Sequence, residues 1–259
     1  MRPLARLRTA MNRARLKRLE RRMAGPALLR AFAAAHPDAV FVEIGSNDGE
    51  QHDHLRPHIL ATRWRGVMVE PVPYVFERLR GNYGHLDRVA LENAAVAAQD
   101  GELPFFHLAE AAPEEREQLP EWYDALGSFS RELLLQHGGA IPAIEERIVE
   151  TRVPTLTFGS LCAKHELGHV DLVLVDTEGH DWEVVRSIDL ERRPPAVLVF
   201  EHYHLSAEDR AAARAHLEAG GYDVMEEGFD TFCLHADAAP ELRALWSGLT
   251  PAVAGVYSP

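Results

Sequence analysis

Short runs of β-branched and other apolar residues alternate with stretches of helical spacing from residue 39 onward. Because this alternation is typical of βαβ units, it predicts an α/β fold with a doubly wound, mainly parallel sheet. The stretch at 222–235 predicts a C-terminal antiparallel hairpin. Ligands of such sheets bind beyond the carboxyl ends of the strands, so we expect the functional residues there. The runs that predict buried strands lie at residues 39–45, 65–71, 87–96, 169–181 and 194–204.

Two regions fall outside this alternation. Residues 1–24 are basic, carry apolar residues at roughly helical spacing, and predict a helical leader. Residues 109–150 are rich in Pro, Glu and Ala and predict a cap or an insertion within the main domain, residues 25–259. Before that region, a turn followed by the run at 103–109 predicts an antiparallel hairpin beside the third strand.

The composition limits the class of protein. The 259 residues are 46% hydrophobic, which is ordinary for a globular domain, and no apolar run approaches the roughly 20 residues that span a bilayer. The N-terminus lacks the apolar segment of a secretory signal. Cys162 and Cys233 have neither metal-type nor redox-type spacing. We therefore expect a reducing, cytoplasmic setting.

Charge is distributed unevenly along the chain. Residues 1–24 contain nine Arg or Lys and one Glu, a charge of +8, so the remainder must carry −21 of the total of −13. An acidic body repels phosphates, which argues against a nucleic-acid partner. The basic leader fits docking on the acidic body, partial disorder, or contact with an anionic membrane surface or an acidic partner.

The first strand ends in VEIGSNDG, a glycine loop with two acids. Gly45 and Gly49 allow a ligand to approach the backbone closely, but the pattern G-x-G-x-x-G is absent. Glu43 and Asp48 would repel a pyrophosphate, whereas a ligand with a cationic amino or sulfonium group would be attracted. The loop therefore favours a nucleoside that carries an amino acid over a dinucleotide.

Glu70 ends the second strand, 21 residues after Gly49, where an acid typically accepts hydrogen bonds from ribose hydroxyls. Asn93, at the end of the third strand, fits either contact with an adenine edge or the capping of a turn. An NAD(P)-dependent oxidoreductase is the alternative enzyme class, and the missing third glycine counts against it. A non-catalytic binding module that keeps the cofactor fold is a further alternative.

The residues at these strand ends resemble the FkbM-type family of S-adenosylmethionine-dependent methyltransferases. The resemblance covers about residues 39–235 and implies a class I methyltransferase (Rossmann-like) fold, with O-methylation of sugars or other hydroxylated metabolites. It places Glu43, Gly45 and Gly49 in the methionine-side loop, Glu70 at the ribose, and Asn93 with Ala94 beside the adenine. Ser46, Asn47, Asp48 and Pro71 complete the predicted cofactor-binding set. The segments that carry the resemblance are, in order, VEIGSNDG, VMVEPVPYVFERLRGN, ENAAV and VDLVLVDTEGHDWEVV.

The chain departs from the family pattern at three positions. Leu174 stands where a Lys is common, Thr157 where an Asp is common, and Asp181 where a Glu is common. These departures leave the cofactor assignment intact, but they affect the expected acceptor and catalytic arrangement.

His180 is the predicted catalytic base, because a hydroxyl nucleophile must lose its proton and His titrates near neutrality. Asp176 and Glu178 complete the predicted catalytic set, and together with Asp181 they are expected either to orient His180 or to raise its pKa. The alternative is that His180 only caps the next helix.

The acceptor site is expected around Glu201, His202 and His204 at the end of the fifth strand, with Ser128 from the inserted region. Strand alternation would send both histidines to one side. A divalent metal held by Asp176, Glu201 and His202 is an alternative that we favour less than acceptor hydrogen bonding. His52, His54, His58 and His85 are expected at the surface. Ser130, Trp122 and Tyr123 are expected either in the acceptor pocket or in an exposed loop.

Overall fold

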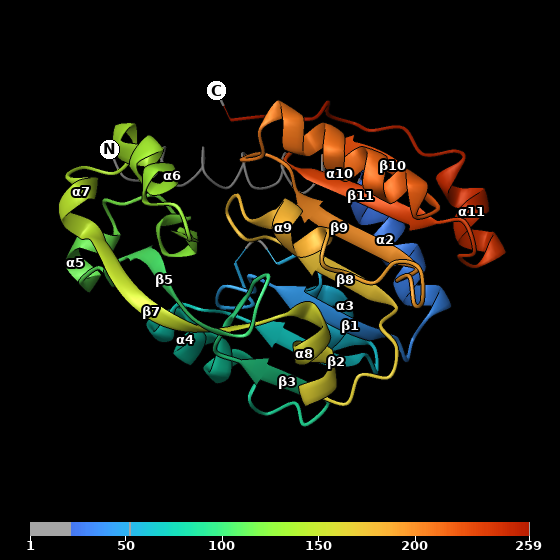
Figure 1. Ribbon diagram of the computed structural model, residues 1–259, viewed down its shortest axis with the longest axis horizontal. Coiled ribbons are helices and arrows are strands. Elements are labelled where there is room, and N and C mark those ends of the chain that lie inside the picture. Colours follow the sequence, from blue (N-terminus) through green and yellow to red (C-terminus); the bar gives the residue numbers. More distant parts are fainter. Residues whose placement is uncertain (1–21, 52, 259) are drawn as a thin grey trace, which may run out of the picture.

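The computed structural model describes residues 22–51 and 53–258, so nearly all of the predicted basic leader lies outside the described residues. Its centre is a seven-stranded sheet with the order β10-β11-β9-β8-β1-β2-β3 (Figure 1). The pairs β10–β11 and β11–β9 are antiparallel, so β11 alone runs opposite to the other six strands. The predicted doubly wound sheet with a C-terminal hairpin is therefore confirmed. The strands are β1 (Val40–Ile44), β2 (Arg65–Val69), β3 (Val89–Glu92), β8 (Leu172–Val175), β9 (Val197–Glu201), β10 (Tyr222–Glu227) and β11 (Asp230–His235).

Helices cover both faces of the sheet, because successive strand side chains point to opposite faces and both faces are apolar. On β1, Phe41 belongs to the core cluster on one face and Val42 to the cluster on the other. The first cluster takes side chains from α2 (Ala24–Ala35), α3 (Arg56–Ala61), α4 (Pro73–Tyr83) and α11 (Pro240–Trp246). The second takes them from α8 (Phe158–Lys164), α9 (Asp181–Val185) and α10 (Ala207–Ala219).

The central strands are in register at their carboxyl ends. Ile44 of β1 pairs with Val69 of β2 on one side and with Val175 of β8 on the other. The loops that follow these three strands therefore emerge at one edge of the sheet. This register places the predicted functional residues together.

A second, four-stranded sheet stands beside the first, with the order β4-β7-β5-β6. The prediction of one strand over 87–96 was wrong, because the chain leaves the first sheet after Glu92 and re-enters strand structure at Ala95. The Asn93 side chain donates hydrogen bonds to the carbonyl oxygens of Glu70 and Pro71, which fixes the chain at this break. The strands are β4 (Ala95–Val96), β5 (Gly101–Leu108), β6 (Gly127–Ser128) and β7 (Ile148–Leu156).

The predicted hairpin beside the third strand was also wrong. The run at 103–109 belongs to β5, which pairs antiparallel with β7 over eight residues rather than with β3. Long, fully paired strands outweigh the local turn signal, because each added pair contributes hydrogen bonds and side-chain contacts.

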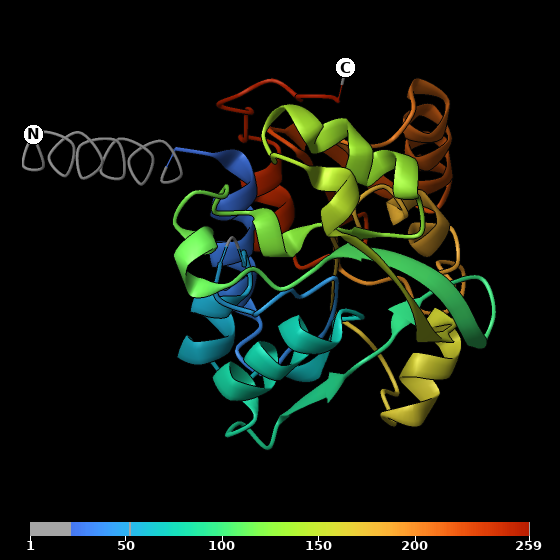
Figure 2. The same cartoon turned by 90° about the vertical axis from the view of Figure 1, so that its left-hand side faces the viewer.

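The inserted region consists of short helices carried at one end of the β5–β7 ribbon (Figures 1 and 2). Its apolar side chains, Tyr123, Leu126, Leu134 and Ile141 among them, pack into a separate cluster with Leu108. The helices are α5 (Pro113–Arg116), η1 (Tyr123–Ala125), α6 (Arg131–Leu135), η2 (Gln136–Gly139) and α7 (Ile144–Arg147). We refer to residues 109–147 as the cap segment; its role as a functional cap stays a prediction.

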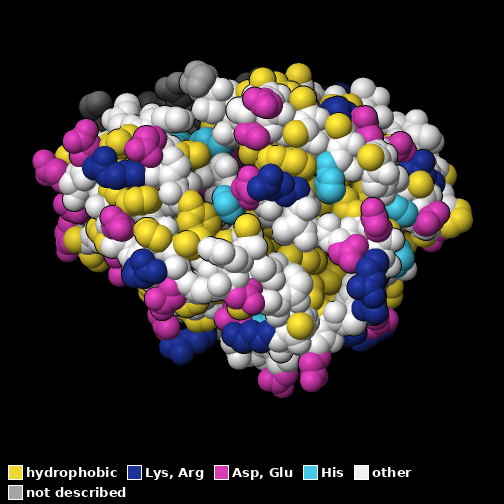
Figure 3. Space-filling view, in the orientation of Figure 1, with side chains coloured by type: hydrophobic (Ala, Val, Ile, Leu, Met, Phe, Trp, Pro, Cys, Tyr) yellow, Lys and Arg dark blue, Asp and Glu magenta, His cyan; other side chains and the backbone are white. Residues whose placement is uncertain are grey.

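Within the part of the chain that the structure describes, no helix has the length and apolar character needed to cross a bilayer. On the face shown in Figure 3, Lys and Arg side chains are scattered among acidic ones and form no continuous basic patch.

Candidate active site

A pocket opens where β1, β2 and β8 end, between the central sheet and the cap segment. Its walls include the glycine loop after β1, the end of β2 and the loop after β8. The cap segment contributes Ala125, Gly127 and Phe129. The predicted site residues that line it are Glu43, Gly45, Ser46, Asn47, Glu70, Pro71, Ala94, Asp176, Glu178 and His180.

Gly45 lets β1 and β8 meet at the floor of this pocket. Its φ of 83° lies in the left-handed region, and a Cβ there would stand 1.6 Å from the carbonyl oxygen of Asp176. The amides of Gly45 and Ser46 both donate to the carbonyl of Val69 at the end of β2. Only glycine permits this close approach of the loop to the Asp176 carbonyl. The glycine loop and the end of β8 are therefore held together.

Glu70 joins the second strand to the glycine loop. Its carboxylate accepts hydrogen bonds from the amides of Val72, at 2.7 Å, and Asn47, at 3.0 Å. Burial raises the pKa of Glu70 to about 7, although these two hydrogen bonds lower it. Asp48 and Asp176 face the same carboxyl group, and Asp48 raises its pKa.

The raised pKa of Glu70 predicts a pH-dependent stability. Between its ordinary value of 4.5 and about 7, folded Glu70 keeps a proton that the unfolded chain has released. The native state then binds more protons, so the free energy of unfolding must fall as pH rises through this window. We expect the ionisation of folded Glu70 to lower the free energy of unfolding by about 3 kcal/mol in total, and this loss is complete above pH ~7. Urea unfolding of the ligand-free protein at pH 5, 6, 7 and 8 measures it.

The matched variant for this pH series is Glu70→Gln, which cannot ionise. We expect a shallower decrease in stability between pH 5 and 7 for this variant than for the wild type. Identical pH profiles for the two proteins would contradict the assignment of a raised pKa to Glu70.

Two further acids face the pocket beside Glu70. Glu43 is 2% exposed, and its Oε2 has no hydrogen-bond partner. Burial, together with Asp53 and Asp176 close by, raises the pKa of Glu43 well above its usual range. Burial also raises the pKa of Asp53. A positively charged ligand would relieve the cost of ionising these carboxyl groups.

Asp48, Gly49 and Asn93 lie behind the pocket wall rather than on it. Asp48 accepts hydrogen bonds from the amides of Glu50 and Gln51 and so holds the loop. Gly49 has a φ of 68°, and a Cβ there would meet the Tyr83 ring at 2.5 Å. Asn93 holds the break between β3 and β4. These three residues therefore support the residues that line the pocket and do not line it themselves.

The loop after β8 brings the predicted catalytic residues to the pocket. Asp181 is fully buried, and its carboxylate accepts hydrogen bonds from the amides of Thr177 and Gly179, which closes the turn. Asp176 lines the pocket. His180 packs on the Phe129 ring at 4.7 Å, and its Nε2 is buried without a hydrogen-bond partner. Burial lowers the pKa of His180.

The predicted acceptor residues do not share one orientation. The strand that was expected to continue to 204 ends at Glu201, so alternation does not apply beyond it. His202 turns toward β11, where its Nδ1 lies 2.9 Å from the Thr231 hydroxyl. His204 turns toward the loop after β8, where its Nε2 lies 3.0 Å from Glu178. The predicted placement of both histidines on one side was therefore wrong.

The metal set predicted from the sequence, Asp176 with Glu201 and His202, is not brought together. Glu201 ends β9 with its Oε2 buried and unpartnered. Among the described residues, the group of His, Cys, Asp and Glu side chains close enough to share an ion is His137, Glu178 and His204.

Ser128 contacts the catalytic loop directly, because its hydroxyl donates to the carbonyl of Glu178 at 2.9 Å. Ser130 instead caps α6, and Tyr123 is fully buried in the cap segment. Trp122 packs against His137, with ring centroids 5.2 Å apart.

Sequence reasoning missed three residues near the pocket. Asp53 and His54 line it, and His54 forms an ion pair with Asp230 of β11 at 3.2 Å while its side chain stays 38% exposed, in agreement with its prediction as a surface residue. His85 is exposed as predicted, and His52 lies outside the described residues. His137 reaches the loop after β8 from the cap segment, and local sequence patterns do not predict a contact between such distant segments.

Comparison with known families shows which family the chain belongs to. The Methyltransferase FkbM domain family matches residues 43–224, which run from the first acid of the glycine loop into β10. The chain belongs to the FkbM methyltransferase family. No curated protein matches this FkbM-family chain.

Solved methyltransferases are similar to this FkbM-family protein at low sequence identity. Methyltransferase FkbM from Methylobacillus flagellatus KT is 11% identical, with a TM-score of 0.47 over 77% of this chain and 44% of that chain. A precorrin-6y C5,15-methyltransferase from Geobacter metallireducens GS-15 is 15% identical, with a TM-score of 0.35 over 76% and 71%. The FkbM-family chain therefore spans less than half of the Methylobacillus protein.

The pocket fits S-adenosylmethionine, the methyl donor that the FkbM family implies. Glu70 follows β2 directly, and its carboxylate has acceptor capacity beyond its two amide partners, as ribose hydroxyls require. The unpartnered Oε2 of Glu43 offers an acceptor for a cationic amino group. Gly45 has no side chain, so the loop can lie against the Asp176 carbonyl and leave the pocket beside it open. These residues would hold the ribose and the amino-acid end of the cofactor.

Proposed function

We propose that this protein is an S-adenosylmethionine-dependent O-methyltransferase whose acceptor is a hydroxyl of a sugar or glycosylated metabolite. The observation that supports it most is the position of His180, whose imidazole lines the pocket with an unpartnered Nε2. When bound, the cofactor would supply a methyl group attached to a positively charged sulfur, and the sulfur would keep the electron pair of the broken bond. The proposal of a sugar acceptor rests on the family resemblance.

Some residues of the chain would position the cofactor, and others would take part in proton transfer. Glu70 and the glycine loop hold the cofactor, and holding reactants in line can lower a barrier by roughly 7–11 kcal/mol in ideal cases. His180 accepts the proton of the acceptor hydroxyl at Nε2. Phe129 packs on the His180 ring and limits its rotation. Asp181 fixes the turn that presents His180.

The alternative of an NAD(P)-dependent oxidoreductase conflicts with the charge of the pocket. A dinucleotide would place its pyrophosphate beside the glycine loop, where Glu43, Asp53 and Glu70 face the cavity. The unpartnered Nε2 of His180 argues against a module that only binds its cofactor, because unpaired buried polar atoms are costly to keep.

Replacement of the proposed base should affect turnover and leave cofactor binding intact. For His180→Ala we expect turnover to fall by roughly 10²–10⁴-fold, the usual contribution of a positioned acid or base. Transfer of labelled methyl groups to a panel of hydroxylated acceptors, sugars among them, measures kcat, and calorimetry measures the affinity for S-adenosylmethionine.

The exposed His85→Ala is the matched control and should keep wild-type turnover. Full turnover in His180→Ala would remove His180 as the base. Labelling of amines but of no hydroxylated acceptor would contradict O-methylation.

The acidic body and the scattered basic side chains of Figure 3 support a small-molecule acceptor and no nucleic-acid partner. We also propose a cytoplasmic setting. Cys162 and Cys233 are both free, and proteins of a reducing environment rarely carry disulfides. We propose that the basic leader, residues 1–24, contacts an anionic membrane surface or an acidic partner.

A further inference from the structure

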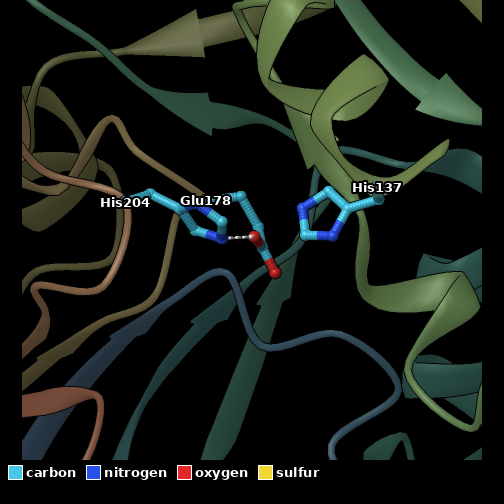
Figure 4. Close-up of side chains that lie close together, drawn as sticks. All are labelled: His137, Glu178 and His204. Atoms are coloured by element: carbon cyan, nitrogen blue, oxygen red, sulfur yellow. Dashed lines mark ion pairs between the residues drawn. The ribbon is translucent and has the colours of Figure 1, made fainter. Parts of the chain in front are cut away.

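Three side chains from distant parts of the chain meet beside the pocket. His137 belongs to η2 of the cap segment, Glu178 to the loop after β8, and His204 to the loop after β9. Figure 4 shows both imidazole rings pointing toward the carboxylate that lies between them. One potential ligand atom from each residue lies within 4.8 Å of the others. We refer to these three residues as the His-Glu-His cluster.

The backbone is strained in a way that brings Glu178 into this cluster. Glu178 has a φ of 50°, which is costly for a residue with a side chain, and the next residue, Gly179, has a φ of 91°. A Cβ on Gly179 would stand 2.5 Å from Leu133 of the cap segment. The Ser128 hydroxyl donates to the carbonyl of Glu178 and holds this conformation. Strained backbone that is held from two sides is typical of a functional site.

The hydrogen bonds within the cluster are incomplete. His204 is 5% exposed at its side chain and pairs with Glu178, with 3.0 Å between Nε2 and Oε2. The Nε2 of His137 is buried and has no hydrogen-bond partner, and its ring lies 5.5 Å from that of His204. A buried, unpaired ring nitrogen directed at a carboxylate and a second imidazole is a costly arrangement without a ligand.

We propose that His137, Glu178 and His204 bind a divalent transition-metal ion of the zinc class. Two imidazoles and one carboxylate are a common ligand set for catalytic zinc and for iron(II), whereas magnesium and calcium prefer oxygen ligands. Three protein ligands leave at least one coordination position open. This site differs from the Asp176, Glu201 and His202 set considered from the sequence.

The role of the metal rests on the proposed methyltransferase function. Glu178 lines the cofactor pocket, so the proposed ion would lie beside the pocket in which the acceptor hydroxyl must meet the methyl group. A bound cation lowers the pKa of a coordinated hydroxyl and orients it, which would assist proton removal by His180. Because His137 comes from the cap segment, the ion would also join that segment to the central sheet.

The experiment measures metal binding without any turnover. Tag-free full-length protein is stripped with a chelator and titrated with Zn²⁺ by calorimetry and with Co²⁺ by visible absorption. We expect one ion per chain and a rise in melting temperature on addition of Zn²⁺, because the ion binds only the folded arrangement. The variants are His137→Ala and Glu178→Gln, and the exposed His85→Ala is the matched control.

Each variant should bind Zn²⁺ at least about 10-fold more weakly than the wild type and should lose the Co²⁺ absorption, whereas His85→Ala should keep both. Equal binding by the wild type and both variants, or no binding by the wild type, would overturn the proposal. Glu178→Gln preserves side-chain shape, so it tests the site even if His137→Ala does not fold. Titration of the same proteins with S-adenosylmethionine separates the two proposals: cofactor binding without metal binding rejects only the metal site, and the reverse rejects only the cofactor assignment.

Discussion

Gly45→Ala should destabilise the protein by at least about 3 kcal/mol and abolish binding of S-adenosylmethionine. The added Cβ would stand 1.6 Å from the carbonyl oxygen of Asp176, at a φ of 83° that alanine adopts only with strain. Neither atom can move freely, because the amide of Gly45 is bonded to Val69 and the amide of Asp176 to Ile44. Relief therefore requires β1 and β8 to separate at the pocket floor.

Urea unfolding measures this loss as a lower midpoint, and calorimetry measures the loss of cofactor affinity. Gly81→Ala is the matched control, since Gly81 lies within α4 and nothing is within 4 Å of its Cβ position. That change should stabilise the protein by about 0.5–1 kcal/mol, because alanine is the better helix former. A loss below about 1 kcal/mol for Gly45→Ala would contradict the close approach of the two strands.

Glu70→Ala should weaken S-adenosylmethionine binding by about 1–3 kcal/mol. The variant removes the carboxylate that we assign to the ribose hydroxyls, and it leaves the amides of Asn47 and Val72 without their acceptor. The affinity of the wild type should also decline as pH falls below about 7, because Glu70 then takes up a proton and loses acceptor capacity.

Calorimetry at pH 8 and at pH 6 tests both parts. The matched control is Glu77→Ala on the exposed side of α4, where Glu77 pairs only with Arg80 in the same helix. Its affinity should equal that of the wild type. Unchanged affinity in Glu70→Ala, with the variant folded, would show that Glu70 does not hold the ribose.

Much of the fold could be predicted from the sequence, because strand and helix signals of this chain are local. β1, β2, β8 and β9 are short apolar runs, and their order with a final hairpin is sufficient to indicate the doubly wound sheet. The ends of strands were harder to predict. β9 stops at Glu201, after which His202 turns toward Thr231 of β11. The chain breaks between β3 and β4 at Asn93, whose side chain donates to the carbonyl oxygens of Glu70 and Pro71. Both places depend on contacts with distant segments.

The cofactor side of the site could be predicted for the same reason. Glu43, Gly45 and Glu70 follow directly from strand ends that parallel register brings to one edge. The acceptor side could not, because it depends on contacts across more than 30 residues. His137 approaches Glu178 only because β5 and β7 carry the cap segment over the sheet, and His54 pairs with Asp230 across the pocket.

Titration of the folded wild-type protein with S-adenosylmethionine, S-adenosylhomocysteine and NAD, each in calorimetry at pH 8, tests whether the pocket binds the methyl donor. We expect one site per chain for both sulfur nucleosides and no binding of NAD, because the acids around the glycine loop favour a cationic ligand over a pyrophosphate. Binding of NAD in place of the sulfur nucleosides, or no binding of either sulfur nucleoside, would contradict it.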